Sequence, residues 1–133
     1  MSVRIRHSLC AQQAMRTCIE VCLSSNLQTM PHLNGDLTRH PARRMIEEGL
    51  AVTFCTENAL VSHTDMVREL SLAAEAFELS SGQLRSAVYN GFKRSFMPMR
   101  YTAKRDYNRR IISYYKRVEK EFGFGGKHGE DRA

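Results

Sequence analysis

Two short apolar runs in the first half of the chain predict β-strands. Residues 19–23 (IEVCL) and residues 51–55 (AVTFC) both have the length of a strand. Polar residues follow each run directly, at positions 24–26 (SSN) and 56–58 (TEN). Such clusters mark the point where a strand passes into a loop. We therefore expect two strands that each end in polar side chains.

The segment between the two runs predicts a loop and then a short helix. The stretch from Ser24 to Gly35 is rich in residues that favour loops. Pro41 is suited to the first turn of a helix and Gly49 to its C-terminal cap, which predicts a helix over about residues 41–48. Strand, loop, helix and strand in this order are typical of a parallel β/α unit.

The second half of the chain predicts helices. From Thr64 onward, apolar residues recur at spacings of three and four, which indicates one buried helix face. Ser80 and Gln83 have the form of a capping box and predict a further helix that ends before Pro98. Its apolar stripe comprises Leu84, Val88, Phe92 and Phe96. The same periodicity predicts a last helix over about residues 102–122.

Composition is typical of a soluble globular protein and limits the architecture. The chain has 133 residues, of which 42% are hydrophobic and 26% are charged. A (β/α)8 barrel typically needs about 250 residues, so barrel elements in this chain would form only part of a barrel. We expect a poorly defined start segment at residues 1–17, a partial domain at residues 18–122 and a flexible tail at residues 123–133.

The net charge of +6 leaves several classes of partner open. Lys and Arg crowd between Lys93 and Lys120, in a region that is predicted to be helical. Because exposed helix faces are normally charged, we interpret this region as a solvated cationic face and do not expect nucleic acid as a partner. No apolar stretch approaches the roughly 20 residues of a membrane span, so no membrane association is expected.

The four cysteines, Cys10, Cys18, Cys22 and Cys55, are not spaced as a metal site, because no Cys-x-x-Cys pair occurs. No apolar run follows the basic start of the sequence, so it does not have the pattern of a signal peptide. We therefore expect a cytoplasmic protein with free thiols that act as small buried hydrophobes.

Three strings, in their order and spacing, resemble the adenosine deaminase family. They are residues 19–29 (IEVCLSSNLQT), residues 49–58 (GLAVTFCTEN), which follow a His40-Pro41 helix start, and residues 90–96 (NGFKRSF). Together the similarity covers about residues 18–122. It implies that the chain is a C-terminal fragment of a (β/α)8 TIM barrel, with the last two strands and the terminal helices.

The resemblance also implies a chemistry. The family is made up of metalloenzymes in which zinc activates water for hydrolytic deamination of a purine nucleoside, base or nucleotide. Its members use a His-x-His pair, a further His and a final-strand Asp as metal ligands, a Glu as proton shuttle and a His beside the attacking water. Here Glu57 stands at the position of the metal-binding Asp, and Asn58 stands at the position of the acid that contacts the purine.

The remaining family residues lack counterparts. None of the five histidines forms a His-x-His pair, and the shuttle Glu with its surrounding motif is missing. Residues 4–7 (RIRH) are similar to the strand end that carries the catalytic His, which makes His7 a candidate, although a residue of the start segment is the plainer interpretation. We expect His32, His40, His63 and His128 to be non-catalytic. The chain alone is therefore predicted to be inactive and to bind no zinc.

Two alternatives belong to other functional classes. The helix from Thr64 and the helix that follows Ser80 have the order of a helix-turn-helix DNA-binding unit, with Arg85, Lys93 and Arg94 available for DNA contacts. Otherwise the chain is an interaction fragment that self-associates or docks onto a full-length paralogue, since a two-stranded sheet leaves its edges unpaired.

Overall fold

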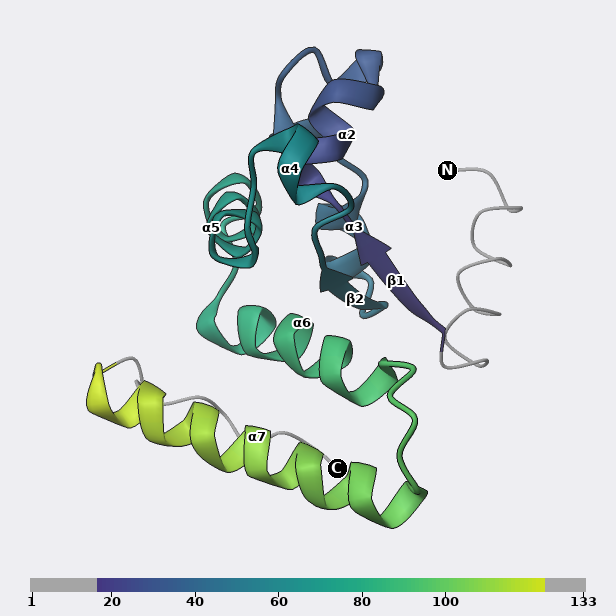
Figure 1. Ribbon diagram of the computed structural model, residues 1–133. Helices are drawn as coiled ribbons and strands as arrows, with labels where there is room; N and C mark the ends of the chain where they lie inside the picture. The colour runs from purple at the N-terminus through teal and green to yellow at the C-terminus, as the bar shows by residue number, and fades with distance from the viewer. Residues whose placement is uncertain (1–16, 124–133) are drawn as a thin grey trace.

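The computed structural model describes residues 17–123 and has a small parallel sheet with helices around it (Figure 1). Strand β1 (Cys18–Val21) pairs with strand β2 (Ala51–Phe54) in parallel, with Cys18 opposite Ala51 and Val21 opposite Phe54. Both predicted strands are therefore confirmed, as is their parallel arrangement. The fold is mixed α/β and mostly helical.

The connection between the strands is more helical than predicted. It comprises helix α2 (Leu23–Thr29), the 3₁₀ turns η1 (Pro31–Leu33) and η2 (Leu37–Arg39), and helix α3 (Ala42–Glu47). The expectation of a loop from Ser24 to Gly35 was wrong over α2. The reason is tertiary, because the carboxylate of Glu69, far along the chain, accepts hydrogen bonds from the first backbone amides of α2.

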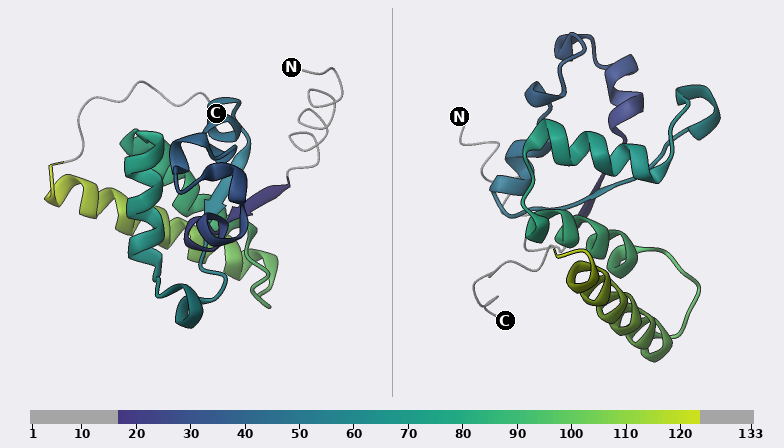
Figure 2. Two further views of the ribbon diagram at one scale, coloured as in Figure 1. Left: turned by 90° about the horizontal axis from the view of Figure 1, so that it is seen from above. Right: turned by 90° about the vertical axis from the view of Figure 1, so that its left-hand side faces the viewer.

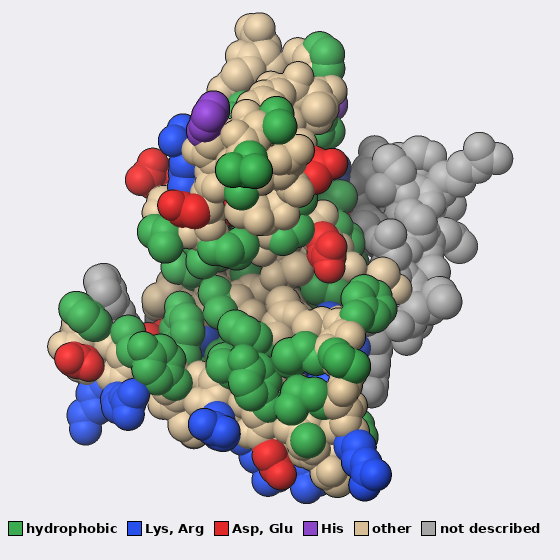
Figure 3. All heavy atoms as spheres, in the orientation of Figure 1, with side chains coloured by type: hydrophobic (Ala, Val, Ile, Leu, Met, Phe, Trp, Pro, Cys, Tyr) green, Lys and Arg blue, Asp and Glu red, His purple; other side chains and the backbone are tan. Residues whose placement is uncertain are grey.

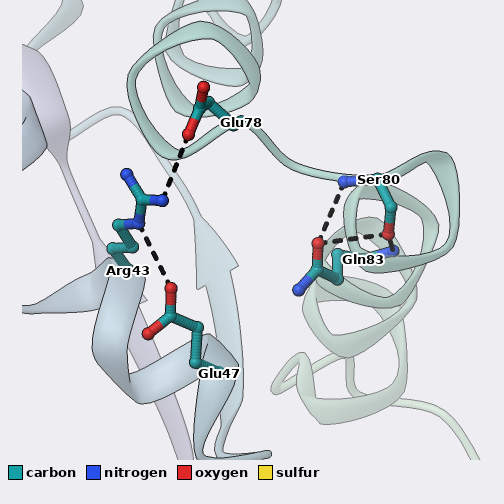
Figure 4. Close-up of polar contacts among 5 residues, drawn as sticks. All are labelled: Arg43, Glu47, Glu78, Ser80 and Gln83. Carbon is teal, nitrogen blue, oxygen red and sulfur yellow. Dashed lines mark hydrogen bonds and ion pairs between the residues drawn. The ribbon is translucent and has the colours of Figure 1, made fainter.

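Helix α3 begins and ends at the signals that the sequence carries. Pro41 occupies its N-cap, and the backbone N–H of Ala42 donates to Nδ1 of the His40 ring at 3.0 Å. Gly49 follows the helix with φ of 77°, a left-handed conformation that glycine adopts without steric cost. The Arg43 side chain then bonds both Glu47 and Glu78 and so joins α3 to the helix that ends before Glu78 (Figure 4).

Two helices follow β2 before the long helices begin. Helix α4 (Ala59–Ser62) is a single turn that the sequence did not predict. Helix α5 (Met66–Phe77) begins at Asp65, whose side chain accepts a hydrogen bond from the Arg68 amide. The pattern from Thr64 onward predicted this helix correctly.

Helix α6 (Ser81–Arg94) starts at the predicted capping box. The Ser80 hydroxyl accepts from the Gln83 amide at 3.2 Å, and the Gln83 side chain accepts from the Ser80 amide at 2.9 Å (Figure 4). The helix ends at Arg94, earlier than its apolar stripe predicted. Phe96, the last residue of that stripe, therefore lies beyond the helix and is 98% exposed.

Helix α6 packs directly on the sheet. The Asn90 side-chain amide donates to the Val52 carbonyl at 3.0 Å, and Ala87 is buried. At Gly91, a Cβ atom would lie 2.8 Å from Oγ1 of Thr53, so the absence of a side chain permits the close approach. The face of α6 that carries Ala87 and Gly91 is therefore occupied by β2.

Helix α7 (Tyr101–Glu121) lies against the opposite side of α6 from the sheet (Figures 1 and 2). The two helices meet through edge-to-face ring pairs, Tyr89 with Tyr115 and Phe92 with Tyr107. Arg85, the first of the predicted DNA-contacting cations, instead bonds a carboxylate oxygen of Glu119 on α7 at 3.1 Å. Figure 3 shows hydrophobic side chains gathered where α6 meets α7, with Lys and Arg along the outer side of α7.

One core lies between the sheet and the helices that cover it. Its buried members come from β1, β2, α3, α5 and α6, together with Leu23, Leu37 and Leu50: they include Val21, Val52, Phe54, Ala42, Ala73, Phe77 and Ala87. Among residues 17–123, no helix combines the length and the apolar character that crossing a membrane requires.

Candidate functional site

The carboxyl ends of both strands meet at one edge of the sheet. Parallel pairing places them side by side, and the backbone amide of Cys55 extends the ladder by donating to the Val21 carbonyl at 3.0 Å. The residues that follow the two strands therefore start from neighbouring positions. In parallel β/α architectures this edge is where loops converge on a ligand.

At this edge the structure brings together the two polar clusters that the sequence singled out. The Ser25 hydroxyl, in the first turn of α2, donates a hydrogen bond to a carboxylate oxygen of Glu57, in the loop after β2. Ser25 is half-buried, whereas Glu57 is exposed. The contact fixes one oxygen of an acidic side chain that lies on the surface.

Asn58 caps the short helix α4. Its side-chain oxygen accepts a hydrogen bond from the Val61 amide at 3.3 Å, and the residue is exposed. His63 closes the same helix in a left-handed conformation with φ of 46° and is also exposed. Asn58 and His63 are close to Glu57 in the sequence. In the structure they occupy the two ends of α4.

His40 is a buried structural residue, only 5% exposed. Its Nδ1 accepts from the Ala42 amide at 3.0 Å, and its Nε2 lies 2.8 Å from the Asn26 side-chain amide. Since Nδ1 is an acceptor, the neutral ring carries its proton on Nε2, and a hydrogen bond there requires the Asn26 amide to present its oxygen to the ring. Burial, with a smaller contribution from His32, lowers the pKa of His40 below its usual value. The ring is therefore neutral near pH 7 and links α2 to α3.

Glu69 is a fully buried carboxylate that sequence reasoning missed. It is 0% exposed, and one of its oxygens accepts from the Leu23 amide at 2.7 Å. The Ser24 amide lies 3.3 Å from both carboxylate oxygens, and the Thr64 hydroxyl donates at 2.8 Å. A signal was present, since Glu69 is four residues before Ala73 and so on the buried face of α5.

Comparison with known proteins identifies the family of this chain. The sequence profile described as adenosine deaminase matches residues 7–114. The chain belongs to the adenosine deaminase family. The predicted resemblance to this family is thereby confirmed.

Individual adenosine deaminases match a shorter segment. The enzyme of Escherichia coli O1:K1 is 37% identical over 79 residues, which are 59% of this chain and 23% of the relative. The enzyme of Klebsiella pneumoniae strain 342 is 35% identical over 79 residues, with the same coverage. The aligned part of the chain thus spans about a quarter of these curated relatives.

The described residues do not make a zinc centre of the kind that the family uses. Among residues 17–123, no group of three or more His, Cys, Asp or Glu side chains is placed to hold a metal ion. His40 has both ring nitrogens within hydrogen-bonding distance of other protein groups. His7 and His128 lie outside the described residues. Glu57, the residue predicted to bind the metal, lies in the loop after β2 at this strand edge.

Proposed function

We propose that this chain forms the last two strands and the terminal helices of a hydrolytic deaminase. Such an enzyme acts on a purine nucleoside, base or nucleotide. Family membership supports the chemistry, and the parallel pair β1 and β2 with α6 on one face supports a portion of a (β/α)8 barrel. In such a barrel the edge with Ser25 and Glu57 would face the substrate.

The contact between Ser25 and Glu57 is the observation that carries the proposal. Glu57 stands where the family has its final-strand metal ligand, and the hydroxyl from the neighbouring strand end holds its carboxylate in place. Zinc is bound by carboxylate oxygen as well as by imidazole, so a Glu is chemically competent there. Its extra methylene shifts the carboxylate by roughly 1.5 Å relative to an Asp.

Asn58 would lie beside the substrate and would interact with it differently from the acidic residue that the family has at this position. An amide is neutral and both donates and accepts, whereas a carboxylate only accepts. Because its oxygen is committed to the α4 cap, its amino group is what remains for a ligand. We propose that Asn58 weakens purine recognition relative to family members that have the acid.

The isolated chain is proposed to be inactive. Hydrolytic deamination replaces the exocyclic amine with oxygen from water, and it needs an activated water and a proton shuttle. The sequence contains no His-x-His pair, and the described residues form no metal cluster. Ammonia release from adenosine, adenine and AMP is measured with and without added zinc. Its rate should not exceed that in buffer without the protein. Zinc-dependent turnover would refute this part of the proposal.

A graft tests the proposed position of Glu57. The 79-residue segment that aligns with the Escherichia coli adenosine deaminase would replace its counterpart in that enzyme, whose remaining parts supply the other ligands. Glu57→Asp in the graft should raise kcat at least about tenfold over the unchanged graft, because a metal ligand displaced by about 1.5 Å misplaces the reaction. Glu75→Asp, an exposed change on α5, serves as the control. Equal kcat values for the unchanged graft and the graft with Glu57→Asp would contradict the assignment.

A further inference from the structure

Two thiols continue the register of the sheet beyond its last pair. Cys22 follows Val21 and Cys55 follows Phe54, and these two preceding residues are direct partners. The sulfur atoms of Cys22 and Cys55 lie 3.3 Å apart, and both residues are half-buried and free. Cys18 does not face a second thiol across the sheet, because Ala51 stands opposite it.

We propose that Cys22 and Cys55 are a thiol oxidation site that closes to a disulfide on reaction with a small-molecule disulfide such as oxidised glutathione. Adjacent strands lie about 4.8 Å apart, which is inside the range of about 4.4–6.8 Å between Cα atoms in disulfides. The sulfur atoms must approach by little more than 1 Å to reach a bond of about 2.05 Å. Rotation about the Cα–Cβ bonds provides this movement.

The reaction balances as two thiol–disulfide exchanges. The Cys22 thiolate attacks one sulfur of oxidised glutathione, which forms a mixed disulfide and releases one glutathione thiolate. Cys55 then loses its proton to water, and its thiolate attacks the Cys22 sulfur and releases the second glutathione. Two protein thiols are oxidised and one disulfide is reduced, so no further oxidant is required.

The surroundings of Cys55 make the second exchange the slow one. Burial, followed by the hydrogen bond with Cys22, raises the pKa of Cys55 to about 12. Its thiolate is therefore scarce at pH 7, and the closing rate should rise with pH. When Cys22 carries glutathione, its own hydrogen bond with Cys55 is lost, which favours the Cys55 thiolate.

The disulfide would tie the strand ends beside the Ser25 and Glu57 contact. Cys22 is three residues before Ser25, and Cys55 is two residues before Glu57. The linked positions are 33 residues apart, so the bond would close a loop that contains α2 and α3. This inference does not depend on the proposed deaminase function, since it rests on the sulfur geometry alone.

The test is peptide mapping of the whole chain after reaction with oxidised glutathione at pH 8. Free thiols are alkylated, and the chain is cut with trypsin and with a Glu-specific protease, which separates Cys18 from Cys22 at Glu20. The native chain should yield mainly the peptide that links Cys22 to Cys55, with Cys10 and Cys18 alkylated. In guanidinium chloride, the nearby Cys18 and Cys22 should pair more often, because short loops close more readily.

Matched serine variants separate the two exchanges. Cys18→Ser should leave the Cys22 to Cys55 link unchanged. Cys55→Ser should accumulate glutathione on Cys22, since the second exchange is blocked. Recovery of the same disulfide mixture from the native and the denatured chain, or of Cys22 and Cys55 as separate glutathione adducts in the native chain, would overturn the proposal.

Discussion

Replacement of Glu69 by Ala tests whether a buried carboxylate, rather than local sequence, holds the start of α2. The change removes the acceptor for the Leu23 and Ser24 amides and for the Thr64 hydroxyl. A buried polar group left without a partner costs about 1–3 kcal/mol. The Thr64 hydroxyl can still bond Ser24, so the two amides account for most of the loss, and the deleted side chain leaves a cavity. We expect a loss of about 3–5 kcal/mol, from two buried amides left without an acceptor together with the cavity.

Urea unfolding followed by circular dichroism measures this loss. Glu69→Gln keeps one carbonyl oxygen and should lose less than Glu69→Ala, because a single acceptor remains for the amides. Glu75→Ala on the same helix is the matched control: Glu75 is exposed, and Ala has the higher helix propensity, so its free energy of unfolding should stay within about 0.5 kcal/mol of the original chain. A loss for Glu69→Ala no larger than that for Glu75→Ala would refute the role of the carboxylate.

Two further predictions concern the packing around the sheet. The lowered pKa of His40 means that the unfolded chain binds more protons than the folded one, so the free energy of unfolding should fall as pH drops from about 7.5 to 5. In His40→Gln this pH dependence of chemical denaturation should shrink, while exposed His63→Asn should keep it; parallel curves for all three chains would contradict the assignment. Gly91→Ala should lower the melting temperature, with a cost of about 1–3 kcal/mol, because its Cβ would meet the Thr53 hydroxyl at 2.8 Å. In a Thr53→Ala background the same change should be neutral or stabilising, and an equal cost in both backgrounds would show that the contact is not the cause.

Local signals in the sequence predicted most helices and strands, because each signal corresponds to an interaction or a backbone conformation that the structure contains. The reciprocal hydrogen bonds of Ser80 and Gln83 start α6, and Gly49 closes the turn after α3 with a positive φ. The two apolar runs form the paired strands because their residues pack into the core that the helices cover. These signals act over a few residues, so the sequence displays them directly.

Helix α2 was missed because its cause is not local. Its residues 23–29 (LSSNLQT) carry no capping side chain, and the group that satisfies its first amides stands on α5. The sequence predicted that the polar residues after the two parallel strands lie at one edge of the sheet. It did not predict that Ser25 and Glu57 are in contact. Which side chains touch there depends on how α2 is held, and a pattern of polar residues does not encode that.

Two acidic residues, Glu69 on α5 and Glu57 at the strand edge, bind successive residues of α2. Glu69 binds the backbone of Leu23 and Ser24, and Glu57 accepts the hydroxyl of Ser25, which is the next residue. The position of Ser25 therefore depends on Glu69, although Glu69 is fully buried and does not face the edge. In the proposed site, Glu69 would be a positioning residue, and Glu57 would be the group that meets a ligand. The graft separates the two roles, because Glu69→Ala should lower activity and folding stability together, whereas Glu57→Ala should lower activity at nearly unchanged stability.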